Sequence, residues 1–174
     1  HAVSERLVSG KTLGWHQGRS EFGPRALGFR SMLGDARRAD IRDHINFKIK
    51  NREWWRPLAP VVLEEDASTW FEIDRPSPYM LLSAKVRDGY REKVPGIVHV
   101  DGTSRVQTVN EKQNPLVYKL LQQFKSQTGV PMLLNTSFNT DGEPIVETPS
   151  DAIKTFQRCG LDSLAIGRCV MDRG

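Results

Sequence analysis

The stretch Val130-Pro131-Met132-Leu133-Leu134-Asn135-Thr136-Ser137-Phe138-Asn139 joins an apolar run to a polar end. The apolar run 130–134 predicts a buried strand. Four of the five residues in 135–139 carry hydrogen-bonding side chains. Polar groups gathered where a buried strand ends are typical of a ligand site in an α/β fold. This stretch therefore predicts both the fold class and the position of a site.

Helix signals flank this predicted strand on both sides. Asn114-Pro115 predicts a helix start, with an N-cap followed by proline at the first helical position. Gly129 predicts its end, and the expected buried stripe is Leu116, Leu120, Leu121 and Phe124. Thr148-Pro149-Ser150-Asp151 predicts a last helix with a capping box, whose Ile153 and Phe156 face inward. The segment 164–170 predicts a final strand, so the whole chain is expected to be one α/β or α+β domain over residues 1–174.

Composition narrows the class of protein. Hydrophobic residues make up 38% and charged residues 26% of the 174 residues, which are globular values that argue against disorder and fibrous repeats. No apolar run approaches the roughly 20 residues of a membrane span. Cys159 and Cys169 are too few for a disulfide scaffold, and the four histidines are scattered, so we expect a cytoplasmic protein without a local metal site. The start His1-Ala2-Val3 is typical of a domain cut from a longer protein.

Positive charge is concentrated in one part of the chain. Residues 19–56 hold ten Lys/Arg and five Asp/Glu, whereas the rest of the chain holds fifteen and sixteen. The formal net charge of +4 is therefore local. The segment centres on Gly23-Pro24-Arg25-Ala26-Leu27-Gly28, where glycines allow close backbone approach to an anion. From charge alone a solvated basic face is the simpler explanation.

The middle of this basic segment predicts a helix from an N-cap at Asp35 to about Lys48. Its inward face repeats every four residues, at Ile41, Ile45 and Ile49. Arginines on its other faces are expected to be mostly solvated, namely Arg37, Arg38 and Arg42. Lys50 falls at or just beyond the helix end.

The end of the basic segment leads into a second predicted strand. Trp54 and Trp55 lie in a turn-prone stretch, where packing is favoured over base stacking. The segment 58–63 predicts a strand, and Pro60 suggests an edge position or a bulge.

Candidate anion ligands lie in three separate places, and each is expected at an element end or in a turn. They are Arg25 with Lys50 and Arg56, then Arg105, then Asn135 with Ser137. Arginine holds phosphate or carboxylate with a planar fork, and lysine adds a point charge. Asn and Ser can orient an amide or carbonyl. The set suits phosphate plus a small polar acyl group. Neither a Walker A motif nor GxGxxG occurs.

These residues belong to a longer set of motifs. Trp15-His16-Gln17-Gly18-Arg19-Ser20-Glu21-Phe22-Gly23-Pro24-Arg25-Ala26-Leu27-Gly28 resembles the signature of the C-terminal domain of O-carbamoyltransferases of the nodulation-factor and antibiotic-tailoring type. The resemblance runs through nearly the whole chain in order, at Asn46, Lys48, Lys50, Arg52-Glu53, Arg56-Pro57, Ala59-Pro60, His99-Val100-Asp101-Gly102-Thr103, Arg105, Gln107, Thr128-Gly129, Asn135-Thr136-Ser137-Phe138-Asn139 and Gly142-Glu143-Pro144-Ile145-Val146.

The resemblance implies a YrdC-like domain with a twisted mixed sheet and flanking helices. It implies use of carbamoyl phosphate and ATP, with Mg²⁺, to form a carbamoyl-adenylate. A Kae1-like N-terminal domain, absent from this chain, would carry the metal and pass the carbamoyl group to a substrate hydroxyl. By position, the residues around carbamoyl phosphate and the adenylate are Arg25, Lys50, Arg56, Arg105, Asn135 and Ser137. Catalytic roles fall on Lys50, Ser137 and Arg25; phosphate is assigned to Arg25, Lys50 and Arg56, and the carbamoyl group to Asn135 and Ser137.

Two other classes of function fit parts of the sequence. A nucleic-acid-binding module would suit the pI of about 9.2 and the tryptophans beside the basic run, and its binding would weaken steeply with salt. The confined patch argues against it. A non-catalytic interaction domain would use the basic loop to dock on its partner domain.

Overall fold

The computed structural model describes all residues from His1 to Gly174, and its centre is one eight-stranded sheet. The strands run in the order β4-β5-β3-β6-β2-β1-β7-β8. Their bounds are β1 (Leu13–His16), β2 (Arg30–Gly34), β3 (Ala59–Leu63), β4 (Leu82–Lys85), β5 (Thr103–Val109), β6 (Met132–Ser137), β7 (Ser163–Ile166) and β8 (Cys169–Asp172). The helices are α1 (Ala2–Val8), α2 (Ile41–Asp43), α3 (Ala67–Trp70), α4 (Pro115–Thr128) and α5 (Pro149–Arg158).

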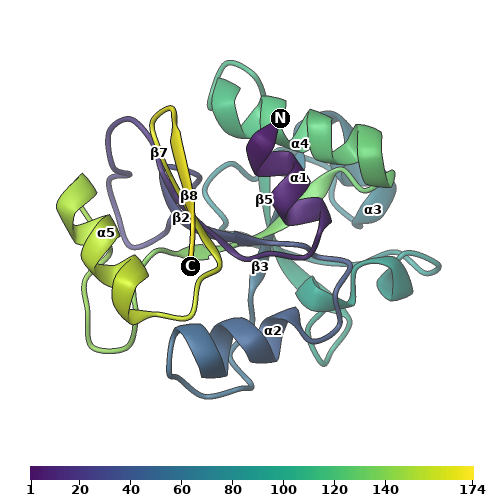
Figure 1. The fold of residues 1–174 in the computed structure, drawn as a ribbon. Helices are drawn as coiled ribbons and strands as arrows, with labels where there is room; N and C mark the ends of the chain where they lie inside the picture. The colour runs from purple at the N-terminus through teal and green to yellow at the C-terminus, as the bar shows by residue number, and fades with distance from the viewer.

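The sheet is mixed, and helices cover it. β1 pairs parallel with β7 and β3 with β5, while the other neighbours are antiparallel. In Figure 1, α1 and α4 lie on the upper side of the sheet, α2 lies below it, and α5 stands beside β7 and β8. The predicted mixed α/β architecture is confirmed. No helix is both long and apolar enough to span a membrane.

The predicted helix before β6 is confirmed, with one change in its buried face. The side chain of Asn114 accepts a hydrogen bond from Val117 N at 3.1 Å, and Gly129 ends α4 in the left-handed conformation. The buried residues are Val117, Leu120, Leu121 and Phe124, which follow the i, i+3, i+4, i+7 spacing of one helix face. Leu116 lies one residue outside that stripe and is 50% exposed, so its predicted burial was wrong.

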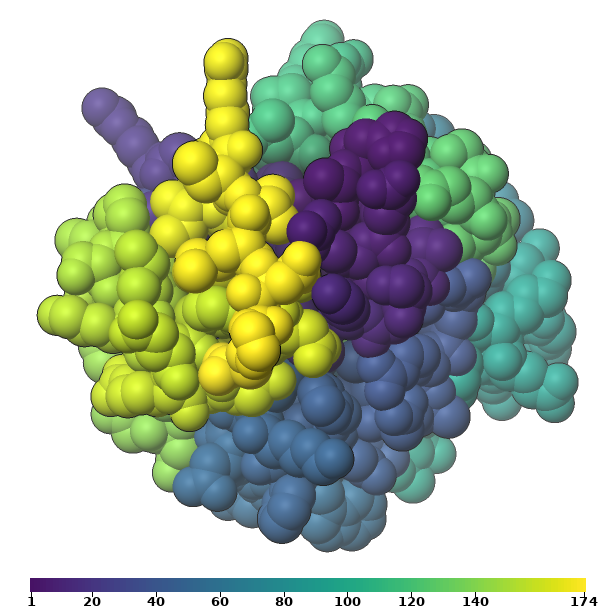
Figure 2. Space-filling view, in the orientation of Figure 1, coloured from purple at the N-terminus to yellow at the C-terminus, as the bar shows by residue number.

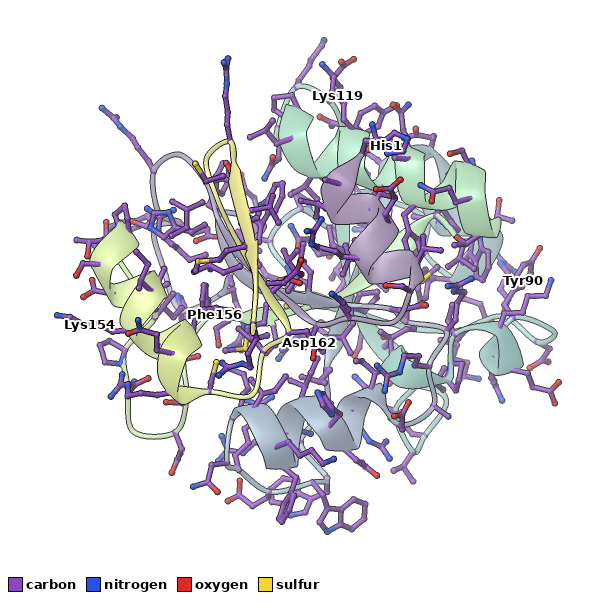
Figure 3. All side chains as sticks on the ribbon, viewed as in Figure 1. His1, Tyr90, Lys119, Lys154, Phe156 and Asp162 are labelled. Carbon is purple, nitrogen blue, oxygen red and sulfur yellow. The ribbon has the colours of Figure 1, made fainter.

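The C-terminal part contains a helix and a hairpin. Thr148 and Asp151 form the predicted capping box of α5. Phe156 packs toward the sheet while Lys154 points away (Figure 3), whereas Ile153, which was expected to face inward, is exposed. The single predicted strand over 164–170 is in fact two strands, because the chain turns at Gly167 with φ of 56°.

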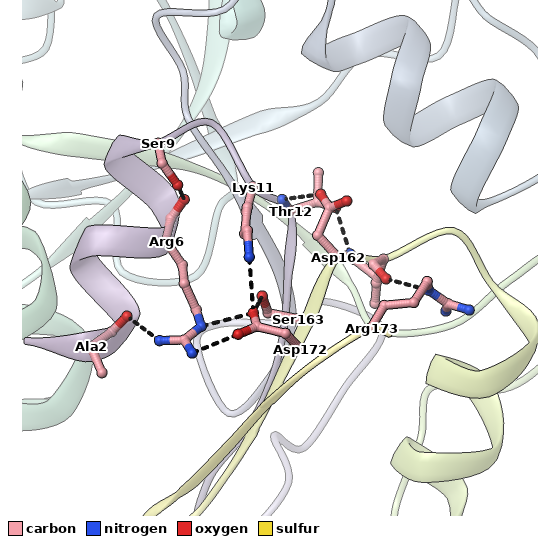
Figure 4. A network of polar contacts seen from close by, with 10 residues as sticks. Ala2, Arg6, Ser9, Lys11, Thr12, Asp162, Ser163, Asp172 and Arg173 are labelled. Carbon is pink, nitrogen blue, oxygen red and sulfur yellow. Dashed lines mark hydrogen bonds and ion pairs between the residues drawn. The ribbon is translucent and has the colours of Figure 1, made fainter.

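An ion-pair network joins the two ends of the chain. Arg6 on α1 donates to both carboxylate oxygens of Asp172 on β8, at 2.9 and 2.7 Å, and Lys11 and Ser163 also donate to Asp172 (Figure 4). These hydrogen bonds lower the pKa of the Asp172 carboxyl. The first and last segments accordingly adjoin on one face of the molecule (Figure 2).

The basic helix begins later than the sequence predicted. Its first residue is Ile41, and it continues as a π-helix from His44 to Ile49. Asp35 is buried and accepts hydrogen bonds from Arg37 instead of capping the helix, because the arginine supplies the partner that a buried carboxylate needs. The three isoleucines of the predicted inward face, Ile41, Ile45 and Ile49, are buried as expected.

The arginines expected to be solvated are only partly so. Arg37 also lies over the ring of Phe124 at 5.3 Å. Arg38 donates to Asp40 and to the backbone oxygen of Gly10. Arg42 is paired with Asp43 at 3.5 Å. Each therefore has a specific partner in the folded chain.

Two expectations for the end of the basic segment were wrong. β3 is an internal strand, not an edge; Pro60 is tolerated there because pairing with β5 begins only at Val61, so Pro60 has a strand partner on one side alone. Trp54 and Trp55 are 62% and 60% exposed, so neither is packed in the core.

Candidate functional site

Three adjacent strands form the floor of a polar cleft. The register pairs Ala59 of β3 with Asn135 of β6, and Val61 with Gln107 of β5. Because β3 and β5 are parallel, Arg105, two residues before Gln107, is the neighbour of Ala59 on β5. Asn135 is the neighbour of Ala59 on β6, so Ala59 lies between Arg105 and Asn135. Residues two apart share one face of a strand, and Asn135 Nδ2 donates to Gln107 Oε1 at 2.7 Å on that face. The small side chain of Ala59 leaves the space between these polar groups open.

The glycine-rich loop lies over this floor. Glu21 Oε1 accepts hydrogen bonds from the backbone N–H groups of Leu27, Phe29 and Arg30 at 2.6, 2.8 and 3.3 Å. One carboxylate thus folds the loop back on itself. The carbonyl oxygen of Ala26 accepts from Asn135 Nδ2 at 3.0 Å, and that of Leu27 accepts from Gln107 Nε2 at 2.9 Å. The loop is tied directly to the strands that form the floor.

Gly28 fixes the far end of this loop. Its φ is 103°, and a Cβ there would lie 2.8 Å from Val117 Cγ2 and 2.9 Å from Asn114 Nδ2. Its carbonyl oxygen accepts from Trp15 Nε1 at 2.9 Å and from Asn114 Nδ2 at 3.1 Å. Only glycine satisfies both the backbone conformation and the close approach to α4.

Lys50 lies behind the polar turn that follows β6. The π-helix ends at Ile49, and Lys50, the residue that caps it, turns inside, where it is 3% exposed. Its Nζ donates to Ser137 O at 2.7 Å and to Asn139 O and Oδ1 at 2.9 Å each, with Ser137 Oγ at 3.3 Å. Burial, followed by the charge of Arg52, lowers the pKa of Lys50 to about 7. Lys50 holds the turn from behind and is not among the residues that line the cleft.

Arg52 enters the cleft, and Asn46 positions it. Asn46 is fully buried; its Oδ1 accepts from Arg52 Nε at 2.9 Å. Its Nδ2 donates to the carbonyl oxygens of Trp54 and Arg56 at 3.1 and 2.8 Å. Burial and the nearby charge of Arg56 lower the pKa of Arg52. The Arg56 side chain is itself exposed and paired with Glu53 at 2.8 Å.

The resulting cleft, which we call the arginine cleft, has a volume of about 90 Å³. Three guanidinium groups line it, from Arg25, Arg52 and Arg105, and none of them forms an ion pair with a carboxylate. The remaining lining is Pro24, Ala26, Pro57, Leu58, Ala59, Met80, Asn135, Thr136 and Ser137.

Two polar atoms of this lining are buried without a partner. They are Arg105 Nε and Asn135 Oδ1. Burial, followed by the charge of Arg25, lowers the pKa of Arg105. A buried donor or acceptor without a hydrogen bond costs about 1–3 kcal/mol, so a ligand that supplies the missing partners gains free energy from both.

The structure brings four of the six predicted site residues together at the cleft: Arg25, Arg105, Asn135 and Ser137. It places Lys50 one layer behind them and turns Arg56 toward Glu53. Arg52 was missed as a site residue, although it stands between Lys50 and Arg56 in the same basic run. Gln107 was missed too, because a glutamine inside a strand carries no sign of its role until the register is known.

Comparison with known proteins supports a single family. The model for "Carbamoyltransferase C-terminus" matches residues 4–173. Nodulation protein NolO from Bradyrhizobium diazoefficiens is 48% identical over 95% of this chain and 31% of its own length. The 3'-hydroxymethylcephem-O-carbamoyltransferase of Amycolatopsis lactamdurans is 41% identical over 95% of this chain and 31% of its own. The chain thus spans about a third of the length of these relatives.

Solved structures share the fold at low sequence identity. Full-length HypF in its phosphate- and nucleotide-bound form covers 96% of this chain with a TM-score of 0.70 and 16% identity, and 24% of that chain is matched. Sua5 of P. abyssi, complexed with L-threonine, covers 95% of this chain and 46% of its own, with a TM-score of 0.61 and 13% identity. The expected YrdC-like fold is confirmed. From residue 4 to residue 173, this chain belongs to the carbamoyltransferase C-terminal family.

Proposed function

We propose that the chain binds carbamoyl phosphate and ATP and forms a carbamoyl-adenylate in the arginine cleft. One observation carries this proposal. The same cleft holds three arginines that have no carboxylate partner and a buried amide oxygen that has no hydrogen-bond donor. An anion that also carries N–H groups satisfies both halves of that arrangement. Both proposed reactants are anionic, so charge neutralisation and positioning supply most of what the reaction needs.

The groups of the cleft divide by chemistry. Arg25, Arg105 and Arg52 donate to phosphate oxygens, and charge-assisted hydrogen bonds of this kind are the strong ones. Asn135 Oδ1 accepts from the carbamoyl NH₂, since its own amide NH₂ is already committed to Ala26 O and Gln107 Oε1. Ser137 lies next to Asn135 on the same strand face. Its hydroxyl donates to Asn139 Oδ1 at 2.7 Å in the absence of ligand, and it turns to the carbamoyl oxygen when the ligand is bound.

Lys50 and Arg56 act at the edge of this arrangement. Lys50 Nζ fixes the carbonyl of Ser137 from behind the turn, and in its protonated form it adds positive charge there. We propose that Arg56 reaches phosphate when it leaves Glu53, because an exposed ion pair costs little to break.

The overall reaction requires water to balance. Water releases phosphate from carbamoyl phosphate and leaves carbamate. A carbamate oxygen then attacks the α-phosphorus of ATP, and pyrophosphate leaves. No Asp or Glu lines the cleft, so Mg²⁺ fits this site as an ion carried by the ATP phosphates, where it offsets their charge.

The acceptor step belongs to a partner domain. The family is named for a C-terminus, and the relatives extend well beyond the matched third. We propose that an N-terminal Kae1-like domain of the same protein holds a metal ion and passes the carbamoyl group to a substrate hydroxyl. Both cysteines of this chain are free thiols, which suits a reducing cytoplasm.

Calorimetric titration of the chain with carbamoyl phosphate tests the proposal. Lys50→Ala should abolish binding, while Lys48→Ala, an exposed lysine two residues earlier, should leave it unchanged. Because Lys50 is buried and its loss strands carbonyl oxygens, Arg25→Ala provides a second variant at an exposed position. Affinity unchanged by both Lys50→Ala and Arg25→Ala refutes the assignment.

Pyrophosphate release provides the chemical test. The chain with carbamoyl phosphate and Mg-ATP should release pyrophosphate, and omission of carbamoyl phosphate should stop it. Binding of both ligands without pyrophosphate release would leave a binding domain and refute carbamoyl-adenylate formation by this chain. Saturable binding of carbamoyl phosphate, a single small anion, also separates this site from a nucleic-acid surface, whose binding weakens steeply with salt.

A further inference from the structure

A second hollow adjoins the arginine cleft. It has a volume of about 380 Å³ and is lined by Arg42, Trp55, Pro57, His99, Val100 and Asp101; we call it the Trp55 groove. Pro57 lines both the groove and the cleft. Burial, and to a smaller extent the charges of Arg105 and Arg42, lower the pKa of His99. A single residue thus separates a space lined by arginines from a larger, more open one.

The groove offers an aromatic face on a fixed backbone. The Trp55 side chain is 60% exposed, which is unusual for a residue with so much apolar surface. Asn46 holds the carbonyl oxygens of Trp54 and Arg56, on either side of Trp55. The exposed ring is therefore presented from an anchored segment, and little ordering entropy is lost when a flat ligand stacks on it.

The polar groups of the groove include both an acceptor and a donor. Asp101 Oδ1 accepts from Thr103 N and Oγ1 at 2.9 and 2.7 Å, which holds the carboxylate at the turn before β5. Arg42 Nε is buried and lies 3.5 Å from Asp43 Oδ1, whereas the two terminal nitrogens of Arg42 are not buried and donate to no group of the chain. An aromatic face, a carboxylate and an unsatisfied donor are the groups that recognise a nucleoside, which has a flat base, hydroxyl donors and ring acceptors.

We propose that the Trp55 groove holds the base and ribose of the nucleotide whose phosphates lie in the arginine cleft. The inference rests on the proposed function and adds to it the location of the nucleoside. Trp55 stacks on the base. Asp101 accepts hydrogen bonds from the nucleoside, and Arg42 donates to it. The nucleotide then runs past Pro57, with its phosphate chain toward Arg52 and Arg105.

Comparison of two ligands on four proteins tests this location. ATP and inorganic tripolyphosphate carry the same triphosphate, and only ATP has a nucleoside. The proteins are the wild-type chain, Trp55→Ala, Trp55→Phe and the control Trp54→Ala, which removes the neighbouring exposed tryptophan outside the groove. Dissociation constants are measured by calorimetry with Mg²⁺ present.

Base stacking on an aromatic side chain predicts that Trp55→Ala weakens ATP binding roughly 5- to 150-fold. Its tripolyphosphate affinity should stay at the wild-type value, Trp55→Phe should recover much of the ATP affinity, and Trp54→Ala should match the wild type for both ligands. Unchanged tripolyphosphate binding also shows that Trp55→Ala is folded.

Three results would overturn the inference. Wild-type ATP affinity in Trp55→Ala places the nucleoside elsewhere while leaving the phosphate site intact. Equal loss in Trp54→Ala and Trp55→Ala indicates a general effect of the loop. If neither ATP nor tripolyphosphate binds the wild-type chain, both the proposed function and the inference are refuted. If the nucleoside merely binds outside the Trp55 groove, tripolyphosphate still binds, so the two failures are distinguishable.

Discussion

Replacing Arg105 by methionine should separate stability from anion binding. Arg105 is half-buried, its Nε lacks a partner and no carboxylate pairs with it. Burial and the charge of Arg25 already disfavour its charged form, as the lowered pKa indicates. Methionine keeps an unbranched apolar stem and removes the guanidinium group with its charge. We therefore expect the free energy of unfolding without ligand to change by no more than about 1 kcal/mol, or to rise.

The same substitution, Arg105→Met, should weaken anion binding. Hydrogen bonds to charged groups contribute about 1.5–3 kcal/mol, so Arg105→Met should weaken pyrophosphate binding about 10- to 150-fold. At a concentration 100 times the wild-type Kd, pyrophosphate stabilises the wild type by about 2.7 kcal/mol. If the Kd rises about 100-fold, the same concentration stabilises the variant by only about 0.4 kcal/mol.

Thermal unfolding followed by circular dichroism in phosphate-free buffer, with and without pyrophosphate, measures both effects. Arg168→Met is the matched control, because Arg168 is an exposed arginine in the β7–β8 turn, outside the cleft. It should keep the full ligand-induced stabilisation. An Arg105→Met variant that loses several kcal/mol without ligand, or that keeps the wild-type response to pyrophosphate, would refute the view that Arg105 is held ready for an anion.

Two further predictions concern the elements that build the cleft. Gly28→Ala should destabilise the chain by roughly 2–4 kcal/mol in urea unfolding, because the new Cβ meets Val117 at 2.8 Å in a positive-φ conformation. The control Gly142→Ala, also at positive φ but in open space, should cost only about 1 kcal/mol. Equal losses in the two variants would contradict the packing argument. Lys50 has a pKa of about 7 in the folded chain and of about 10.4 in the unfolded chain. Between these pH values the unfolded chain binds more protons than the folded chain. The contribution of Lys50 to the free energy of unfolding should therefore grow as pH rises from about 7 to 10. Lys50→Met should remove that slope from the pH dependence of the unfolding free energy, and an unchanged slope would contradict the buried, depressed lysine.

Local signals in the sequence were enough for much of the secondary structure. The Asn114 and Thr148 caps, the glycine end at Gly129 and the apolar run before Asn135 each depend on neighbouring residues alone, and each is confirmed. Asp35 misled the prediction of the basic helix, because an aspartate before an apolar repeat can equally be a buried partner of a nearby arginine. Exposure of Trp54 and Trp55 was not predictable either, since aromatic character favours burial until a tertiary context leaves the ring outside.

By itself, the sequence determined the α/β class, the local concentration of positive charge and the membership of the cleft residues Arg25, Arg105, Asn135 and Ser137 in the family motifs. Only the tertiary structure decided how they combine. Strand register sets Arg105 and Asn135 on either side of Ala59, the π-helix turns Lys50 inward, and Asn46 sends Arg52 instead of Arg56 into the cleft. Residue type fixes what a side chain can bind. Its direction and burial depend on contacts between distant segments, such as Ala26 and Asn135, which are 109 residues apart, and no local pattern records these contacts.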